Sequence, residues 1–359
     1  MTKKIILGSS GGPATEGVFN SLKLENNSEE IVGIGSNIND LLTSNIPKKY
    51  LFPPAGSKKY IDTLNKLIFE EKPSFLHFQN DFELFEISKN RNKIDNFEDL
   101  FFIPKHEEFV NCVYKFNSYL KFESAGIKVP RNILINDEAD LRVSFKELGN
   151  NNSDIWFRLN TVGGGGQGSL KTNDYEFIKS WINHHKGWGK FLAAELLTPQ
   201  TVTWQSIWHD GKLVISQARK RQSWVHGNRA PSGITGVTGV GELFSDEELD
   251  KICIKSVKAV SSRPNGLYGV DLTYDSEGIP NPTEINIGRF FTTIEFFTSL
   301  GLNFPAIYKN IFLYNQFPNL ENTFSPLENN YLWIRNMDTR PKLVKKSDLS
   351  STDYEKYIF

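Results

Sequence analysis

The stretch RLNTVGGGGQGS, residues 158–169, places four consecutive glycines, and then a fifth, after a short apolar run that ends in an arginine. Glycine loses more backbone freedom on folding than any other residue, so a run of this kind is costly to order. Four interpretations compete for it. They are a flexible linker, a P-loop, a dinucleotide-binding turn and a loop that covers phosphates.

Two of these interpretations fail or weaken on spacing. A P-loop requires G-x-x-x-x-G-K-[ST]. Gly163 and Gly168 have that spacing, but Ser169 stands where the lysine must be. A dinucleotide turn requires G-x-G-x-x-G followed directly by a helix. Gly163, Gly165 and Gly168 fit that pattern, but the next residues, SLKT, extend the chain before any helix begins, so this match is weak.

The flanks of the run favour the fourth interpretation. Strand-like sequence lies on both sides, in DIWFRLN (154–160) and GSLKT (168–172), which disfavours a linker. The two flanks predict a hairpin whose glycine turn folds over a polyphosphate, because unhindered backbone N–H groups donate to anions. Arg158, at the end of the first strand, would add a bidentate phosphate contact.

The whole chain has the composition of an ordinary globular protein. It has 359 residues, 39% of them hydrophobic and 23% charged, and a net charge of −1, which gives no electrostatic reason to expect nucleic acid or membrane partners. The first residues lack a signal-peptide core and no apolar run approaches a membrane span. Cys112 and Cys253 fit buried thiols. We therefore expect a cytoplasmic protein.

The order of elements predicts more than one domain. Strands alternate with helices in the first hundred residues, which predicts a parallel α/β layer, whereas the second half is mainly antiparallel. We expect an α/β domain at 1–103 and a two-lobed domain at 104–340, with a small lobe at about 130–197 and a larger lobe at about 198–340. The polar residues 341–359 fit a tail.

Three local signals are specific enough to test. Apolar residues of segment 109–120 step by four, three and four, which predicts one long helix. Asn173, with Glu176 three residues later, predicts a helix N-cap. Asp210 and Gly211 predict a hairpin turn.

A second stretch, GVDLTYDSEGIPNPTEINIGR (269–289), offers metal ligands. Glu284 and Asn286 are two residues apart, so they project from one face of a strand, and Asp271 can meet them across the hairpin. Such a group is costly among apolar strands without a cation, and hard oxygen ligands suit Mg²⁺. The alternative, that Asp271 and Glu284 are ordinary strand-end acids, stays open.

In this order, an α/β domain, a lysine-bearing helix, FRLNTVGGGGQGS (157–169), FLAAELL (191–197) and DLTYDSEGIPNPTEINIGR (271–289) resemble the ATP-grasp superfamily. The similarity is strongest to the ATP-grasp domain of the carbamoyl-phosphate synthase large chain and its stand-alone relatives. It covers roughly residues 3–340. It implies a Rossmann-like preATP-grasp domain of α/β class followed by a two-lobed α+β ATP-grasp fold with antiparallel sheets and helices.

The resemblance also implies a role for each matching residue. The nucleotide phosphates would meet Lys115, Arg158 and a lid formed by Gly163, Gly164, Gly165, Gly166 and Gly168. Adenine would meet the backbone of a hinge at Glu195 and Leu197, and Mg²⁺ would bind Asp271, Glu284 and Asn286. Arg289 would lie beside the transferred phosphoryl group, and Arg219 and Arg221 would contact substrate or phosphate.

This sequence departs from the family pattern in three places. Tyr114 stands where an aspartate usually precedes the helix lysine. Arg289 follows Asn286 by three residues instead of two. Thr201 and Val202 occupy the positions of a glutamate that usually binds the ribose hydroxyls, so the ribose contacts are in doubt.

The function implied is an ATP- and Mg²⁺-dependent carboxylate–amine ligase, with Mn²⁺ as an alternative metal and with small-molecule acid and amine substrates. A homodimer stays open. So do three other functions. One is a carboxyphosphate- or carbamoyl-phosphate-forming synthase. Another is a Rossmann-type nucleotide-sugar or NAD enzyme that uses ILGSSGGPATEG (6–17), and the last is a nucleotide-binding regulatory protein without catalysis.

Overall fold

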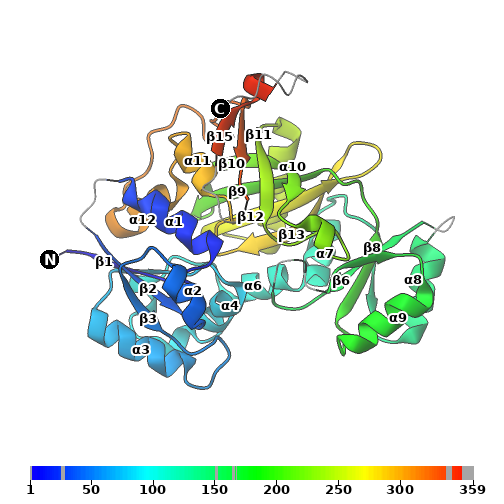
Figure 1. The fold of residues 1–359 in the computed structure, drawn as a ribbon, viewed down its shortest axis with the longest axis horizontal. Coiled ribbons are helices and arrows are strands. Elements are labelled where there is room, and N and C mark those ends of the chain that lie inside the picture. The colour runs from blue at the N-terminus through cyan, green and yellow to red at the C-terminus, as the bar shows by residue number, and fades with distance from the viewer. Residues whose placement is uncertain are drawn as a thin grey trace.

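The computed structural model describes residues 2–25, 29–149, 153–163, 166, 168–336 and 342–349. Three sheets organise them: a parallel sheet of four strands, a small antiparallel sheet of four and a large antiparallel sheet of seven. Figure 1 shows the parallel sheet on the left, the large sheet in the centre and the small sheet on the right. This mixture of parallel and antiparallel sheets confirms the predicted fold class.

The parallel sheet is built from short strands near the N-terminus, in the order β3-β2-β1-β4. Its strands are β1 (Lys4–Leu7), β2 (Glu30–Gly35), β3 (Lys48–Leu51) and β4 (Phe75–His77). The helices between and after them are α1 (Pro13–Lys23), α2 (Ile38–Thr43), α3 (Tyr60–Glu71), α4 (Asp81–Lys89), the 3₁₀-helix η1 (Arg91–Lys93) and α5 (Phe97–Leu100). Strand β3, with the sequence KKYL, buries no residue, so hydrophobic pattern does not predict it.

Two helices from the C-terminal part of the chain complete the parallel sheet. They are α11 (Glu295–Ser299) and α12 (Phe304–Tyr314). Both contact α1, and α12 also contacts β4. The ring of Tyr308 lies 5.9 Å from Phe75 in β4 and 4.8 Å from Phe102, between ring centroids. The first and last parts of the chain therefore share one hydrophobic core.

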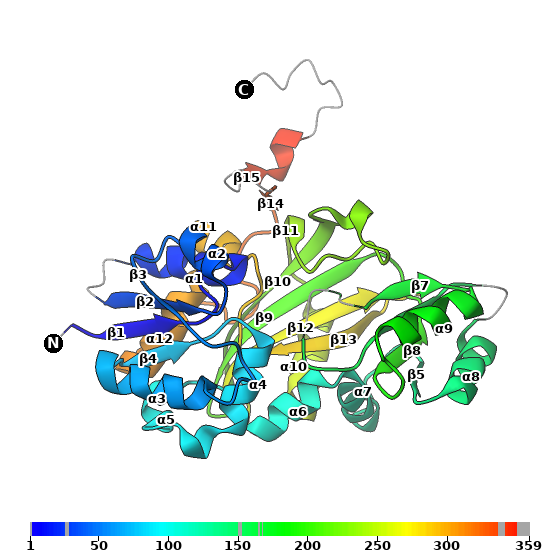
Figure 2. The same cartoon turned by 60° about the horizontal axis from the view of Figure 1, so that its bottom comes forward.

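Helices α6 (His106–Val113) and α7 (Lys115–Ser124) lead from the parallel sheet to the small sheet, as Figure 2 shows. The prediction of one long helix is wrong at Tyr114, whose extended backbone (φ −88°, ψ 98°) separates the two helices. Ser118 stabilises the break, because its hydroxyl donates 2.8 Å to the carbonyl of Asn111. Lys115 thereby becomes the first residue of α7.

The small sheet forms a lobe with its own core, in the order β5-β8-β6-β7. Its elements are β5 (Asn132–Ile135), α8 (Glu138–Leu148), β6 (Ile155–Leu159), β7 (Leu170–Thr172), α9 (Tyr175–His184) and β8 (Phe191–Glu195). β6 and β7 pair antiparallel, which confirms the hairpin around the glycine run. The N-cap of α9 is Asp174 instead of Asn173, because the Asp174 carboxylate accepts from the N–H of Phe177.

The large sheet has the order β13-β12-β9-β10-β11-β14-β15. Its elements are β9 (Thr201–His209), β10 (Lys212–Trp224), the 3₁₀-helix η3 (Gly227–Arg229), β11 (Thr238–Phe244), α10 (Glu247–Val260), β12 (Gly266–Tyr274), β13 (Pro280–Ile287), β14 (Tyr331–Ile334), β15 (Lys342–Lys345) and η4 (Lys346–Leu349). Asp210 and Gly211, both with positive φ, form the predicted turn between β9 and β10. β15 pairs with β14, so residues 342–345 belong to this sheet and not to a tail.

Two smaller expectations also have an outcome. Cys112 and Cys253 are buried and unpaired, as predicted. In the part of the chain that the structure describes, no helix is long and apolar enough to cross a membrane.

Candidate active site

The three predicted metal ligands meet on one face of the β12–β13 hairpin. Asp271 and Glu284 are directly opposite each other in the ladder, so their side chains share a face. The amide nitrogen of Asn286 donates to Asp271 Oδ2 at 2.9 Å. Asp271 also accepts a 2.5 Å hydrogen bond from the hydroxyl of Thr203 on β9. Strand alternation therefore brings the three side chains together as predicted, and their binding of Mg²⁺ stays a prediction.

Two cations from distant segments lie against Glu284. Lys115 Nζ is 3.4 Å from one carboxylate oxygen and Arg158 Nη1 is 3.8 Å from the other. The side chains of Lys115 and Arg158 are 8% and 10% exposed, and that of Glu284 is 23% exposed. The predicted phosphate-binding cations and metal ligands are thus neighbours, and they neutralise one another.

The guanidinium of Arg158 is already held by hydrogen bonds to two other segments. Its Nη2 donates at 2.6 Å both to the hydroxyl of Tyr119 on α7 and to the carbonyl oxygen of Thr283 on β13. Among the described residues, nothing accepts a hydrogen bond from its buried Nε. Burial raises the pKa of Tyr119, so its hydroxyl stays protonated beside the arginine. The guanidinium therefore links α7, β6 and β13.

The glycine run begins beside the same helix. Asn160, the residue after β6, accepts a 3.0 Å hydrogen bond from the N–H of Phe116 and so caps the first turn of α7. A Cβ on Gly163 would lie 3.0 Å from Phe82 on α4, and a Cβ on Gly166 would lie 3.0 Å from Ile234. Gly163, Gly166 and Gly168 all have positive φ. The predicted lid residues Gly164 and Gly165 lie outside the described residues.

These parts surround one small cavity. Asp81, Lys115, Gly163, Glu284 and Asn286 line it, and its volume is about 10 Å³. A cavity of that size has room for about one water molecule. The site therefore holds its charged groups in contact with one another.

Arg289 is held by a group that the sequence analysis missed. Its guanidinium pairs with Asp81, the first residue of α4, and donates 2.5 Å to Asn286 Oδ1. Burial alone would lower the pKa of Arg289, but Asp81 raises it above the ordinary value. Gly288 precedes it with φ +76°, and a Cβ there would lie 2.8 Å from the ring of Phe109. The turn at Gly288 thus aims Arg289 at Asn286, one of the predicted metal ligands.

Arg221, on β10, approaches Asp271, one of the predicted metal ligands, from the other side. It donates 3.1 Å hydrogen bonds to the hydroxyls of Thr201, Thr203 and Thr238, and its Nη2 is 3.6 Å from Asp271. Burial lowers its pKa, and Asp271 partly offsets that effect. The hydroxyl of Thr201 therefore accepts a hydrogen bond from Arg221. Thr201 is one of the two positions where the family pattern expects a ribose ligand.

Arg219 lies two residues away on the same strand face, but it makes no ion pair with Asp271 or Glu284. Its Nε donates 2.8 Å to the hydroxyl of Thr293 and its Nη2 donates 3.1 Å to Thr238. Its side chain is 1% exposed, and burial lowers its pKa well below the ordinary value. Arg219 is instead one of three arginines, with Arg221 and Arg335, that donate hydrogen bonds to Thr238 beside the site.

The predicted hinge begins at the end of β8, whose last residue is Glu195. The N–H of Glu195 donates to the carbonyl of Arg131, and its carboxylate is 3.4 Å from the guanidinium of the same arginine. For Leu197, in contrast, no described residue hydrogen-bonds its backbone N–H or C=O. Leu197 can therefore present one donor and one acceptor to a flat ligand.

The glycine-rich loop after β1 does not offer its N–H groups to a dinucleotide. The N–H of Gly11 donates to the carboxylate of Glu16 at 3.1 Å, and that of Gly12 donates to the carbonyl of Ser9. Glu16 also accepts from the hydroxyl of Ser44 at 2.6 Å. A carboxylate at the start of α1 repels a pyrophosphate, which disfavours the NAD interpretation.

The residues that the sequence analysis missed have weak sequence signals. Asp81 follows β4 at the start of α4, where a polar residue is common at a strand's carboxyl end. Thr203 lies two residues after Thr201 on β9, opposite Arg219 in the ladder, and it accepts a hydrogen bond from Arg221. Arg335 follows β14, far from every motif in the sequence. Their importance depends on partners that lie far away along the chain.

The donor set fits Mg²⁺ better than a softer metal. Within the described residues, no group of three or more His, Cys, Asp and Glu side chains could hold a metal ion. Asp271, Glu284 and Asn286 instead offer two carboxylates and one carboxamide. Mg²⁺ uses one or two carboxylates and completes its shell with water and substrate phosphates. The residues present therefore fit this ion.

Comparison with known proteins points to the fold alone. No protein-family model matches the chain, and no curated protein matches it by sequence. A carboxyaminoimidazole ribonucleotide synthase from Aspergillus clavatus, solved with ATP, has a TM-score of 0.68 at 13% identity, covering 93% of this chain and 81% of that one. At such identity the likeness establishes a common fold.

Two further solved structures have the same architecture. The biotin carboxylase domain of a 2-oxoglutarate carboxylase from Hydrogenobacter thermophilus, solved with Mg-ADP and bicarbonate, has a TM-score of 0.68 at 15% identity, covering 93% of this chain and 74% of that one. An L-amino acid ligase from Bacillus licheniformis has a TM-score of 0.66 at 12% identity, covering 92% of this chain and 79% of that one. The agreement spans nearly the whole chain.

Proposed function

We propose that this chain, whose fold is the ATP-grasp fold of those enzymes, is an ATP- and Mg²⁺-dependent ligase that joins a carboxylic acid to an amine through an acyl phosphate. One observation carries the proposal. Lys115, Arg158 and Glu284 come from three distant segments and meet beside Asp271 and Asn286. Cations and hard oxygen ligands at one point are what a magnesium-bound polyphosphate requires.

Each group has a role in this proposal. Asp271, Glu284 and Asn286 would hold Mg²⁺, which when bound neutralises charge on the transferring phosphoryl group. Lys115 and Arg158 would bind phosphate oxygens, and the backbone of Leu197 would bind adenine. Because the cavity is only about 10 Å³, Mg-ATP must separate Glu284 from the two cations when it binds. Lys115 and Arg158 would then pair with the phosphates of ATP instead of with Glu284.

The proposed reaction has two steps. A carboxylate oxygen of the acid attacks the γ-phosphorus of ATP, the bond to the bridging oxygen breaks, and ADP leaves. The amine then attacks the acyl carbon, inorganic phosphate leaves, and the amine nitrogen loses a proton. Arg289 would stabilise charge beside the transferred group. Both steps depend on positioning and charge neutralisation, so no Ser-His or Cys-His pair is required.

The test is ADP release in the presence of Mg-ATP and panels of carboxylic acids and amines. Glu284→Gln keeps the size of the side chain and removes its charge. We expect this variant to lower kcat by about 100-fold or more, the usual cost of losing one charge-stabilising group. Glu248→Gln, an exposed acid on α10 that pairs with Lys251, is the matched control and should retain full activity.

Several outcomes would decide against the ligase. Absence of Mg-ATP binding, or unchanged ADP release by Glu284→Gln, would contradict it. Release of ADP with bicarbonate as the sole effective acid would instead favour the carboxyphosphate-forming alternative. Mg-ATP binding without turnover on any acid would favour a regulatory protein.

A further inference from the structure

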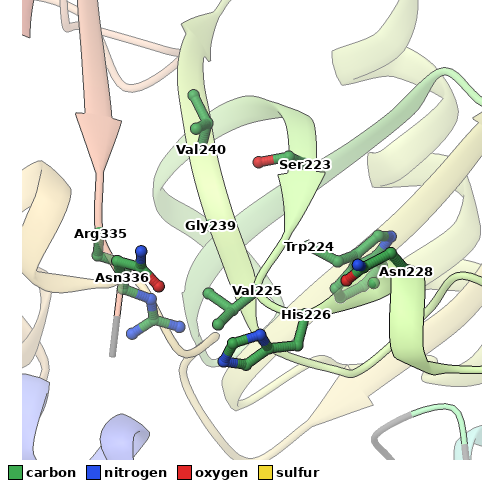
Figure 3. A pocket seen from close by; sticks show the side chains of 10 residues that line it. Ser223, Trp224, Val225, His226, Asn228, Gly239, Val240, Arg335 and Asn336 are labelled. Carbon is green, nitrogen blue, oxygen red and sulfur yellow. The ribbon is translucent and has the colours of Figure 1, made fainter. Parts of the chain in front are cut away.

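A second, larger cavity opens beside the connection between β10 and β11. Its volume is about 430 Å³, within the range of small-molecule sites. Figure 3 shows Arg335 and Asn336, after β14, on one side, and Val225 and His226 on the other. Trp224 and Asn228 also line it. The walls therefore combine apolar surface with hydrogen-bonding groups and one cation.

Three arginines converge on Thr238 at the edge of this cavity. The Thr238 hydroxyl accepts 3.1 Å hydrogen bonds from Arg219 Nη2 and from Arg221 Nε. Its carbonyl accepts a 2.8 Å hydrogen bond from Arg335 Nε. Next to Thr238 in the chain, Gly239 lines the cavity. A single residue thus holds three guanidinium groups together.

This cluster carries more positive charge than its surroundings neutralise. Arg221 has Asp271 at 3.6 Å, but no described carboxylate forms an ion pair with Arg219 or Arg335. Nothing among the described residues accepts a hydrogen bond from the buried Nη1 of Arg219. Glu295 attracts Arg335 from a longer distance, and burial raises the pKa of Glu295. Buried unpaired cations are costly, so the cluster is suited to an anion.

The cluster is also connected to the candidate active site. Arg335 donates 3.1 Å to the carbonyl of Thr292 and 3.2 Å to its hydroxyl, while Arg219 donates to Thr293. These threonines lie three and four residues after Arg289. The short segment 289–293 therefore carries Arg289 and also anchors two arginines of the cluster.

We propose that the cavity binds the acid substrate, and that this acid is a small dianion. One carboxylate would be phosphorylated beside Arg289, and a second anionic group, carboxylate or phosphate, would bind Arg335, the arginine that lines the cavity. Guanidinium forks match both groups in geometry. Trp224 and Val225 would contact the carbon skeleton. This inference rests on the proposed ligase function and names the class of its acid.

The test compares pairs of acids in which one member carries a second anionic group and the other does not. Suitable pairs are glutamate with glutamine, succinate with butyrate, and 3-phosphoglycerate with glycerate, each supplied with the amine panel. We expect kcat/KM for ADP release to favour the dianion by about 10- to 100-fold, the usual worth of a hydrogen bond to a charged group. The first two pairs report a carboxylate preference and the third reports a phosphate preference.

Substitutions of Arg335 test whether this cavity causes the preference for a second anionic group. Arg335→Gln should raise KM for the acid with two anionic groups far more than for its partner with a single carboxylate, and Arg335→Lys should restore part of the difference. Arg263→Gln, an exposed arginine paired with Asp210 at the β9–β10 turn, is the matched control and should keep the full preference. Calorimetric binding of the acids without ATP gives a readout independent of turnover.

The two proposals fail in different ways. Equal use by the native protein of acids with one and with two anionic groups would overturn the dianion inference and leave the ligase intact. A preference for dianions that Arg335→Gln does not change would overturn the assignment to this cavity. Absence of both Mg-ATP binding and ADP release would overturn the ligase itself.

Discussion

Glu83 is a carboxyl group that the fold buries two residues after Asp81 on α4. Its side chain accepts a 2.5 Å hydrogen bond from the hydroxyl of Ser9 and a 3.1 Å hydrogen bond from that of Tyr60. Burial raises its pKa to about 7, although both hydroxyls act in the opposite direction. In the unfolded chain the same group would titrate near 4.5. The protein therefore carries an acid that changes charge near neutral pH.

This raised pKa predicts a specific dependence of stability on pH. Between about pH 4.5 and about pH 7, the folded state keeps the proton of Glu83 and the unfolded state loses it. The folded state then binds more protons, so the free energy of unfolding falls as the pH rises through this window. Glu83→Gln should remove this fall. Between pH 4.5 and pH 7, the free energy of unfolding of the variant should therefore rise by about 3 kcal/mol relative to that of the native protein.

Denaturant unfolding at several pH values measures this effect. Glu248→Gln, exposed on α10, should follow the native protein at every pH. If the curves of Glu83→Gln and the native protein stayed parallel from pH 4.5 to pH 8, Glu83 would not titrate as its burial requires.

Helix α7 depends on a residue that belongs to the glycine loop. The carboxamide of Asn160 caps α7 at Phe116, next to Lys115. Lys115 in turn faces Glu284. Any movement of the loop that displaces Asn160 therefore acts on the position of the lysine. The cap is a physical link between the predicted lid and the predicted phosphate site.

Asn160→Ala should weaken both the helix and nucleotide binding. Loss of a side-chain cap costs about 1 kcal/mol of stability. If that energy positions Lys115, KM for ATP rises by about 5-fold. Asn37→Ala removes the comparable cap of α2, where Asn37 accepts from the N–H of Asn39. That control should lose similar stability with no change in KM, and equal KM values for the two variants would refute the link.

What the sequence predicts at this scale depends on the range of the interaction. The two-residue spacing of Glu284 and Asn286 fixes their common face, because strand alternation is local. The break at Tyr114 is not predicted, because the cap that stabilises α7 comes from Asn160, far along the chain. Asp81 and Arg335 are missed for the same reason. Each acquires its role from a partner more than forty residues away.

The molecule divides into cores that do not follow the order of the chain. One core joins Phe75 of the parallel sheet with Tyr308 of α12 and residues of the large sheet. The small sheet has a separate core around Phe157 and Ile178. We therefore expect the parallel and large sheets to unfold together and the small sheet to open more independently.

Tyr308→Ala tests this division. Removing so large a buried ring should cost about 3–5 kcal/mol and raise hydrogen exchange in β1 and β9 together. Tyr308→Phe is the matched control, because among the described residues the Tyr308 hydroxyl has no hydrogen-bond partner, so its loss should cost little. Ile178→Ala should raise exchange mainly in β6 and β8. Exchange confined to β1 in Tyr308→Ala would contradict a shared core.

The packing of α12 against β4 has a consequence for folding during synthesis on the ribosome. Phe304, where α12 begins, follows β4 by more than two hundred residues. A ribosome adding about 5–20 residues per second would need roughly 10 to 45 seconds for that interval. During this time the nascent chain exposes the apolar ring of Phe75 that Tyr308 later covers. Synthesis of this protein thus passes through a stage at which a chaperone has a surface to bind.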